Sequence, residues 1–224
     1  MRSVGILGGM GPEATILLMQ KVLGAVTAQD DADHLPLIVH QNPQVPSRIK
    51  ALLEGGGEDP GPVLAAMAQD LERAGAQALA MPCNTAHHYA DAVREASGLP
   101  FLDMLELTAA HLAALGAKRI GMLASPATRR VGVFDRVFAA HGLSPVWTGD
   151  EDEMLAIIRA VKAGEPMAPL GPRLRGLADA MAGADHWLVA CTELSLMTCA
   201  LEGGPGWTDS LDCLVAGVAE FGFA

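Results

Sequence analysis

Short apolar runs alternate with longer stretches of helical period along the chain. The apolar runs predict buried strands at residues 3–8, 35–39 and 76–81, and the periodic stretches predict helices at 12–29 and 63–74, with another helix starting at Asn84. Pro12 suits the first position of its helix, and Gly75 follows the end of the second helix. Strands that alternate with helices in this way predict an α/β protein whose parallel sheet is covered on both faces.

The second half of the chain repeats the first in outline. Residues 119–126 resemble the opening strand and turn, and residues 186–192 resemble residues 78–85. From the glycine of the first strand to the cysteine is 83 minus 5, or 78 residues, and the second half gives 191 minus 121, or 70. We therefore expect two pseudo-symmetric α/β/α lobes with mainly parallel sheets. We place them at 1–102 and 103–205, with 206–224 packing back on the first lobe.

Each lobe carries a cysteine where a strand ends and a helix begins, Cys83 in the first and Cys191 in the second. Ligands of open α/β sheets bind outside the carboxyl ends of the strands, so both cysteines should face the cleft between the lobes. A helix start favours thiolate, which predicts a lowered pKa for both. The alternative is that each cysteine simply packs as a small apolar residue. We interpret Cys199 and Cys213 in that way.

Charge, apolar runs and cysteine spacing exclude several classes of function. With 15 basic and 26 acidic residues the formal charge is −11, which argues against a nucleic-acid partner. No apolar run is long enough for a membrane span, and Met1 to Ser3 leads directly into a glycine turn instead of a signal peptide, so we expect a cytoplasmic protein. The four cysteines lack the Cys-x-x-Cys spacing of zinc or redox sites, and we expect neither metal nor cofactor.

Two thiols on opposite sides of a small molecule suit a two-base inversion, in which one thiolate removes a proton from carbon and the other thiol returns one to the opposite face. Removing a proton beside a carboxylate also requires donors that stabilise the enolate. The candidate donors are the amides after each cysteine and the side chains of Asn84, Thr85, Ser125 and Thr128.

Five segments carry a likeness to a known family: GILGGMGPEAT (5–15), PCNTAH (82–87), CTEL (191–194), PSR (46–48) and VKAG (161–164). The chain thereby resembles the cofactor-independent aspartate/glutamate racemase superfamily, in its aspartate racemase and broad-specificity amino-acid racemase branch. The resemblance implies that Cys83 and Cys191 are the paired acid and base, that no pyridoxal phosphate is used, and that the protein is a homodimer.

The resemblance also implies contacts with the substrate. Arg48 and Lys162 would surround a side-chain carboxylate, which an arginine fork and a lysine charge suit. We add Met10 in the glycine turn, and Thr192 and Glu193 after the second cysteine, as substrate-binding candidates. The chain departs from the family pattern at Ser47, Ala190 and Ser195, where an acid, a glycine and a proline or small residue are common. These departures leave the substrate side chain open.

Plainer interpretations exist for several of these residues. The glycine turn could be a dinucleotide fingerprint, but the second strand runs into His40 without the acid that would hold a ribose. His87 and His88 could serve a cysteine hydrolase, or be ordinary helix residues. Glu193 and Lys162 both occupy helix ends at which the dipole alone favours their charge.

The residues together favour a racemase of an acidic amino acid, aspartate and possibly glutamate. One rival is a single-cysteine reaction of the same superfamily on a small diacid, decarboxylation or cis-trans isomerisation. The other is a noncatalytic two-lobed protein that binds an acidic metabolite.

Overall fold

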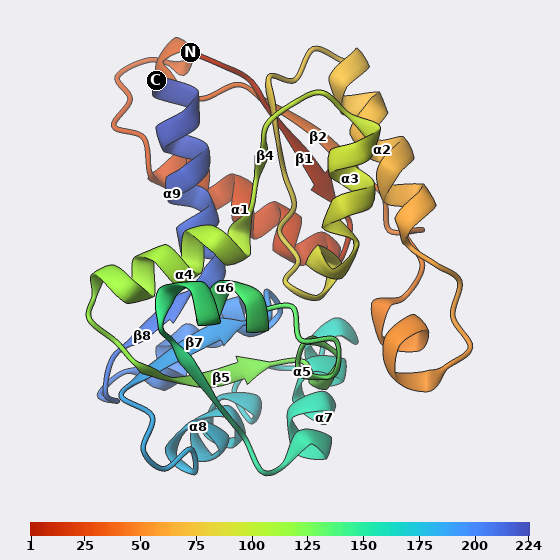
Figure 1. Ribbon diagram of the computed structural model, residues 1–224. Coiled ribbons are helices and arrows are strands. Elements are labelled where there is room, and N and C mark those ends of the chain that lie inside the picture. Colours follow the sequence, from red (N-terminus) through yellow and green to blue (C-terminus); the bar gives the residue numbers. More distant parts are fainter.

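The computed structural model describes all residues from 1 to 224 and contains two parallel sheets (Figure 1). The first half comprises β1 (Val4–Gly8), α1 (Pro12–Gly24), η1 (Asp31–Asp33), β2 (Leu37–Gln41), η2 (Lys50–Glu54), α2 (Gly61–Arg73), β3 (Ala78–Ala80), η3 (Thr85–Tyr89), α3 (Ala90–Ala96), β4 (Phe101–Leu102) and α4 (Met104–Ala114). The second half comprises β5 (Arg119–Ala124), α5 (Pro126–Arg130), α6 (Asp135–His141), β6 (Ser144–Trp147), α7 (Glu151–Lys162), α8 (Leu170–Asp179), β7 (His186–Ala190), η4 (Leu194–Leu201), β8 (Trp207–Asp209) and α9 (Ser210–Phe223).

The strand orders are β2-β1-β3-β4 and β6-β5-β7-β8, and every pairing is parallel. The two halves therefore have the same topology, and the predicted α/β class with two lobes is confirmed. The predicted strand at 35–39 lies two residues later, at Leu37–Gln41, and the predicted helix at 12–29 ends at Gly24. The helix expected at Asn84 begins as the short 3-10 helix η3 and continues as α3.

Each sheet is covered on both faces because successive side chains of a strand point to opposite sides. In β1, Val4 and Ile6 pack with α1 and α9, while Leu7 packs with α2. In β7, Leu188 packs toward α4 and α6, while Val189 packs toward α7 and α8. These alternating contacts build four apolar clusters, one on each face of each sheet.

The last helix of each half crosses to the sheet of the other half. Helix α4 follows β4 of the first sheet, yet its buried residues Leu105 and Leu112 pack on the second sheet. Helix α9 follows β8 of the second sheet, yet Leu211 and Leu214 pack on the first sheet. The two helices also pack against each other at the junction of the sheets (Figure 1). Thus β8 belongs to the second sheet while α9 packs on the first, and the lobe boundaries at 1–102 and 103–205 remain predictions.

The turn after β1 requires glycine at residue 9. Gly9 has a φ of +95°, and a Cβ there would lie 2.4 Å from the backbone of Asn42. Its N–H donates to the Thr15 hydroxyl at 2.9 Å, which ties the turn to the first turn of α1. The turn is thereby held close to the end of β2 and beside the cleft.

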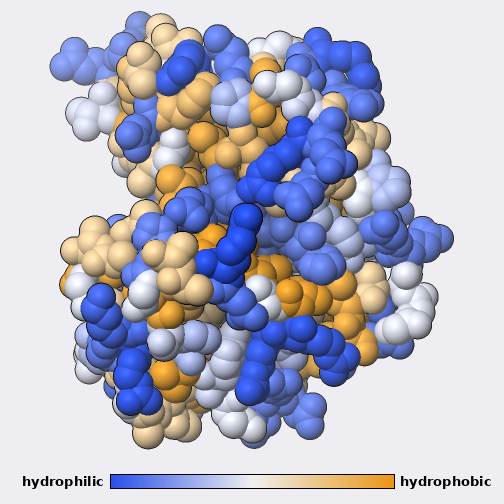
Figure 2. Space-filling model, in the orientation of Figure 1, coloured by the Kyte–Doolittle hydropathy of each residue, from blue (hydrophilic) through white to orange (hydrophobic).

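Polar and apolar side chains are interspersed over the face shown in Figure 2. None of the helices combines the length and the apolar character that a membrane span requires.

Candidate active site

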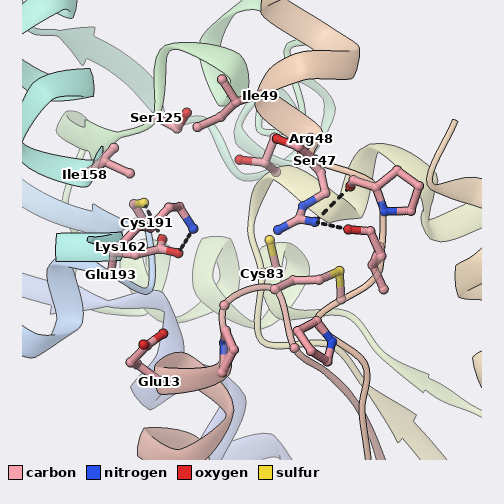
Figure 3. A pocket seen from close by; sticks show the side chains of 18 of the residues that line it. Glu13, Ser47, Arg48, Ile49, Cys83, Ser125, Ile158, Lys162, Cys191 and Glu193 are labelled. Carbon is pink, nitrogen blue, oxygen red and sulfur yellow. Dashed lines mark hydrogen bonds and ion pairs between the residues drawn. The ribbon is translucent and has the colours of Figure 1, made fainter. Parts of the chain in front are cut away.

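A cavity of about 590 Å³ lies at the carboxyl ends of the strands and is lined by residues of both halves. Eight of the eleven residues predicted for the site line it: Met10, Arg48, Cys83, Thr85, Ser125, Lys162, Cys191 and Glu193. Figure 3 shows Cys83 and Cys191 on opposite sides of this space, with Lys162 and Glu193 beside Cys191 and Arg48 on the side of Cys83. The fold therefore brings the two cysteines of the repeat to one cavity.

Cys83 lies three residues after β3, in a short connection before η3. Its backbone N–H donates to Met81 O at 2.8 Å. The N–H of Met104 donates to His87 Nε2 at 3.3 Å, so Nδ1 carries the ring proton and donates to Cys83 O at 2.9 Å. Burial lowers the pKa of His87. Both ring nitrogens are thus engaged by the backbone, which leaves this histidine as a buried support for the cysteine loop.

Cys191 follows β7 directly and bonds to a carboxylate. Its Sγ–H donates to Glu193 Oε2 at 3.1 Å. Burial, and next the Glu193 carboxylate, raise the pKa of the Cys191 thiol well above its usual value, while Lys162 opposes them. The prediction of a lowered pKa is therefore wrong for Cys191. The segment after it is the short 3-10 helix η4, broken at Met197, so the positive end of a long helix is missing there.

Glu193 connects Cys191 to Lys162. Its second oxygen, Oε1, forms an ion pair with Lys162 Nζ at the end of α7. Burial alone would lower the pKa of Lys162, but the charge and hydrogen bond of Glu193 reverse this, and the pKa is raised. The lysine stays charged. Lys162 does more than complement a helix dipole, because it lines the cavity and pairs there with the Glu193 carboxylate (Figure 3).

Arg48 is held by the loop that precedes it. Its Nη1 donates to Val45 O at 3.2 Å and to Pro46 O at 2.9 Å. These two bonds orient the guanidinium through one nitrogen and leave Nη2 and Nε as donors toward a ligand. Arg48 and Lys162 come from different halves of the chain, so a dianionic ligand could contact a cation on each side.

Hydroxyl groups line the edge of the cavity. The Thr85 and Thr128 hydroxyls bond to each other at 2.9 Å, which joins η3 to α5 across the cleft. The Ser125 hydroxyl accepts the N–H of Ala127 at 3.3 Å and caps α5. Thr85 and Ser125 line the cavity directly, whereas Thr128 acts behind Thr85.

Three predicted residues, Asn84, Thr128 and Thr192, do not line the cavity. Asn84 is buried, and its Nδ2 donates to the Ser210 hydroxyl at 2.9 Å. Thr192 is also buried. It lies between Cys191 and Glu193, whose side chains bond to each other just after β7. Within this arrangement, no group of three or more His, Cys, Asp or Glu residues could hold a metal ion.

The structure adds lining residues that the sequence interpretation missed. Glu13, Ser47, Ile49 and Ile158 all line the cavity. Ile158 lies one helical turn before Lys162, so the spacing along α7 could have indicated it. Glu13 follows the glycine turn, and a Cβ on Gly11 would meet its Oε2 at 3.2 Å. In the sequence, only the position of Glu13 after the glycine turn pointed to the cavity, and an acid in the first turn of a helix is common without any ligand.

Comparison with known proteins identifies the family of the chain. The family described as Asp/Glu/Hydantoin racemase matches residues 7–219. The chain therefore belongs to the Asp/Glu/hydantoin racemase family, and it is an isomerase of that family.

Relatives place the chain within the family. The broad specificity amino-acid racemase RacX of Bacillus subtilis is 24% identical over 94% of each chain. The aspartate racemase of Picrophilus torridus is 27% identical, with a TM-score of 0.90 over 100% of this chain and 95% of that one. An aspartate racemase homologue from Pyrococcus horikoshii, at 20% identity, shares the fold with a TM-score of 0.75 over 100% of both chains.

The contacts of Cys191 generate a prediction about its reactivity. Glu193→Gln removes a carboxylate that raises the pKa of the thiol, so the pKa of Cys191 should fall. At fixed pH below that pKa, iodoacetamide should then alkylate Cys191 faster, which peptide mass spectrometry measures at this residue alone. Glu165→Gln, at an exposed acid three residues beyond the end of α7, is the matched control and should leave the rate unchanged. Unchanged or slower alkylation of the Glu193→Gln variant contradicts the prediction.

Proposed function

We propose that the protein racemises an acidic amino acid, aspartate and possibly glutamate, with Cys83 and Cys191 as the opposed acid and base and without pyridoxal phosphate. The observation that carries the proposal is that both thiols line one cavity from opposite halves of the chain. A substrate between them presents one face of its Cα to each sulfur. That arrangement is what inversion at carbon requires.

The hydrogen bond of Cys191 supports one choice of starting protonation states. Cys191 donates to Glu193, so it starts as a thiol. In one direction, the Cys83 thiolate takes the Cα proton, and Cys191 gives its proton to the opposite face of the enolate. After turnover Cys83 is the thiol and Cys191 the thiolate, which is the starting state for the opposite enantiomer. When the enzyme resets between these states, Cys83 releases its proton to solvent, and Glu193 takes one from solvent and passes it to Cys191.

Fixed donors would stabilise the enolate between the two proton transfers. We assign this role to the Thr85 and Ser125 hydroxyls and to the backbone amides after the cysteines, including that of Thr192. Asn84 and Thr128 support these groups through their own hydrogen bonds. Met10 would contact the substrate from the glycine turn. Donors that are held before the substrate arrives need no reorganisation during the reaction.

The two cations favour an acidic side chain. Arg48 offers its free guanidinium edge, and Lys162 adds a second positive charge that it shares with Glu193. The likeness to an aspartate racemase supports the same choice. The relative RacX is described as having broad specificity, so a wider range of side chains is the alternative. Ser47, which lines the cavity beside Arg48, is where that range could be set.

A single-cysteine reaction on a small diacid is the rival within the superfamily. It would use one thiol as a proton donor and would leave the other dispensable. The symmetric placement of Cys83 and Cys191 on the same cavity counts against it. We also propose that the enzyme works in the cytoplasm, because a reducing compartment keeps both thiols unoxidised.

The two-thiol mechanism predicts the loss of racemisation on replacing either cysteine. Cys83→Ser and Cys191→Ser should each lower kcat by at least about 100-fold in both directions, since each removes one acid-base group. Proton NMR in heavy water, with L- and then D-aspartate and glutamate and no added cofactor, follows loss of the Cα proton and formation of the other enantiomer. Cys199→Ser, at an exposed cysteine, is the control and should be fully active. Full activity of either cavity variant would exclude the mechanism.

Replacing Arg48 tests whether this residue binds the side-chain carboxylate of the substrate. Arg48→Met should lower kcat/KM for an acidic amino acid by about 10- to 100-fold, because a hydrogen bond to a charged group contributes about 1.5–3 kcal/mol. Turnover of alanine, which lacks the distal carboxylate, should change little. Arg136→Met, at an exposed arginine of α6, controls for general effects of losing a positive charge. Equal losses for acidic and neutral substrates contradict the assignment of Arg48 to the side chain.

We also propose a homodimer, as the family resemblance implies. Ile16, Met19 and Leu23 lie along one face of α1 and are 55%, 42% and 55% exposed, which leaves apolar surface available for such a contact. Sedimentation equilibrium should give twice the mass of one chain, and Met19→Asp should shift the distribution toward the monomer. A monomer at all concentrations contradicts this proposal.

A further inference from the structure

One buried hydroxyl connects the two cysteine-bearing strand ends. Ser210 Oγ accepts from Asn84 Nδ2 at 2.9 Å and donates to Val189 O at 3.0 Å. Asn84 directly follows Cys83, and Val189 precedes Cys191 by two residues. All three bridging residues are buried, with exposed fractions of 2% or less. This hydroxyl thus joins the two cysteine loops by hydrogen bonds that lie outside the cavity lining.

Ser210 is itself firmly held. It is the first residue of α9, whose N-cap is Asp209. The Asp209 carboxylate accepts from Leu211 N at 2.9 Å and from the Ser195 hydroxyl at 2.9 Å. Lys21 of α1 lies 3.8 Å from the same carboxylate. The hydroxyl therefore sits at a fixed point where α9 leaves the second sheet and crosses to the first.

The repeat shows that the fold does not require a hydroxyl here. In the first half, β4 is followed by the N-cap Asp103 and then by Met104, as β8 is followed by Asp209 and then by Ser210. Met104 and Ser210 are thus equivalent residues, each the first of its crossing helix. A methionine is the first residue of α4, and a serine is the first residue of α9. The serine hydroxyl makes a hydrogen bond between the halves that a methionine thioether cannot make. We therefore connect its role with the spacing of the two cysteines.

The chemistry of the site depends on that relation. In a two-base inversion both sulfurs must lie within reach of one Cα, on opposite sides of it. A misplacement of about 1 Å can cost about 100-fold in rate even when it arises far from the reacting atoms. A single hydroxyl that bonds both strand ends limits such misplacement, because neither end can shift without breaking a buried hydrogen bond.

We propose that Ser210 is a positioning residue for racemisation, and that its hydroxyl sets the spacing between Cys83 and Cys191 by bridging Asn84 and Val189. This inference rests on the proposed function. It gives Asn84 the role of a spacer between the halves, distinct from contact with the substrate.

The test compares Ser210→Ala with Thr108→Ala. Thr108 is a matched control because it is a fully buried hydroxyl that donates within its own helix, to Met104 O. Ser210→Ala should lower kcat by about 10- to 100-fold in both directions. The KM should stay within about twofold, because Arg48 and Lys162 are untouched. Thr108→Ala should keep the kcat of the unmodified protein.

The isotope effect separates positioning from simple loss of folded protein. With a substrate deuterated at Cα, the isotope effect on kcat should rise in Ser210→Ala, because proton transfer becomes more rate-limiting when the sulfurs are misplaced. A smaller folded fraction would lower the apparent kcat and leave the isotope effect unchanged. A lower kcat with an unchanged isotope effect, or an unchanged kcat, overturns the proposal.

A second variant covers the case in which Ser210→Ala does not fold. Asn84→Ala removes the other end of the bridge and should give the same loss of kcat and the same rise in the isotope effect, with KM preserved. A selective rise in KM would make Asn84 a substrate contact and overturn the bridge. The double variant should be no slower than the slower single variant, since both substitutions break the same bond between Asn84 and Ser210.

Failure of this inference is distinguishable from failure of the proposed function. If the unmodified protein exchanges no Cα proton of any amino acid, the racemase proposal fails. If it racemises but Ser210→Ala matches Thr108→Ala in kcat and isotope effect, only the positioning role fails. The rate at which 1,2-dibromoethane joins Cys83 to Cys191, detected by peptide mass spectrometry, gives a readout that needs no substrate and should fall in Ser210→Ala.

Discussion

The packing of α4 against α9 is the contact on which the arrangement of the site depends. Each helix leaves one sheet and buries its apolar residues on the other, so neither half completes its core alone. This exchange holds the carboxyl ends of both sheets toward one cleft. Because the strands within each sheet are all parallel, β3 and β7 deliver their cysteines to that cleft from opposite sides.

Electrostatics then make the two thiols unequal. Burial, and next the Glu193 carboxylate that accepts its S–H, raise the pKa of Cys191, while Lys162 forms an ion pair with the other oxygen of that carboxylate. In the proposed mechanism, this hydrogen bond favours the thiol form of Cys191 at the start of the reaction. The same lysine lines the cavity, so in the proposed mechanism one ion pair would connect recognition of a substrate carboxylate with the proton on Cys191.

The two halves of the internal repeat carry different residues at a few equivalent positions, and these differences matter for the contacts between the halves. His87 lies four residues after Cys83 and bonds to backbone, whereas Ser195 lies four residues after Cys191 and bonds to the N-cap carboxylate of α9. Met104 and Ser210 differ at the start of the crossing helices. The shared positions build the sheets and caps, and the differing ones carry contacts that a symmetric pair of lobes would lack.

The sequence by itself determined the α/β class, the repeat, and the placing of Cys83 and Cys191 at strand ends, because these follow from local hydrophobic period and from the geometry of parallel strands. It also indicated Arg48 and Lys162 through the family resemblance, and Glu193 through its place after Cys191. Only the tertiary structure decided that Glu193 raises the pKa of Cys191 and that Asn84 turns away from the cavity toward Ser210, 126 residues along the chain. Burial, which depends on how the whole chain packs, dominates the first outcome, and a contact between distant segments sets the second, because no local pattern records which distant group a buried side chain will meet.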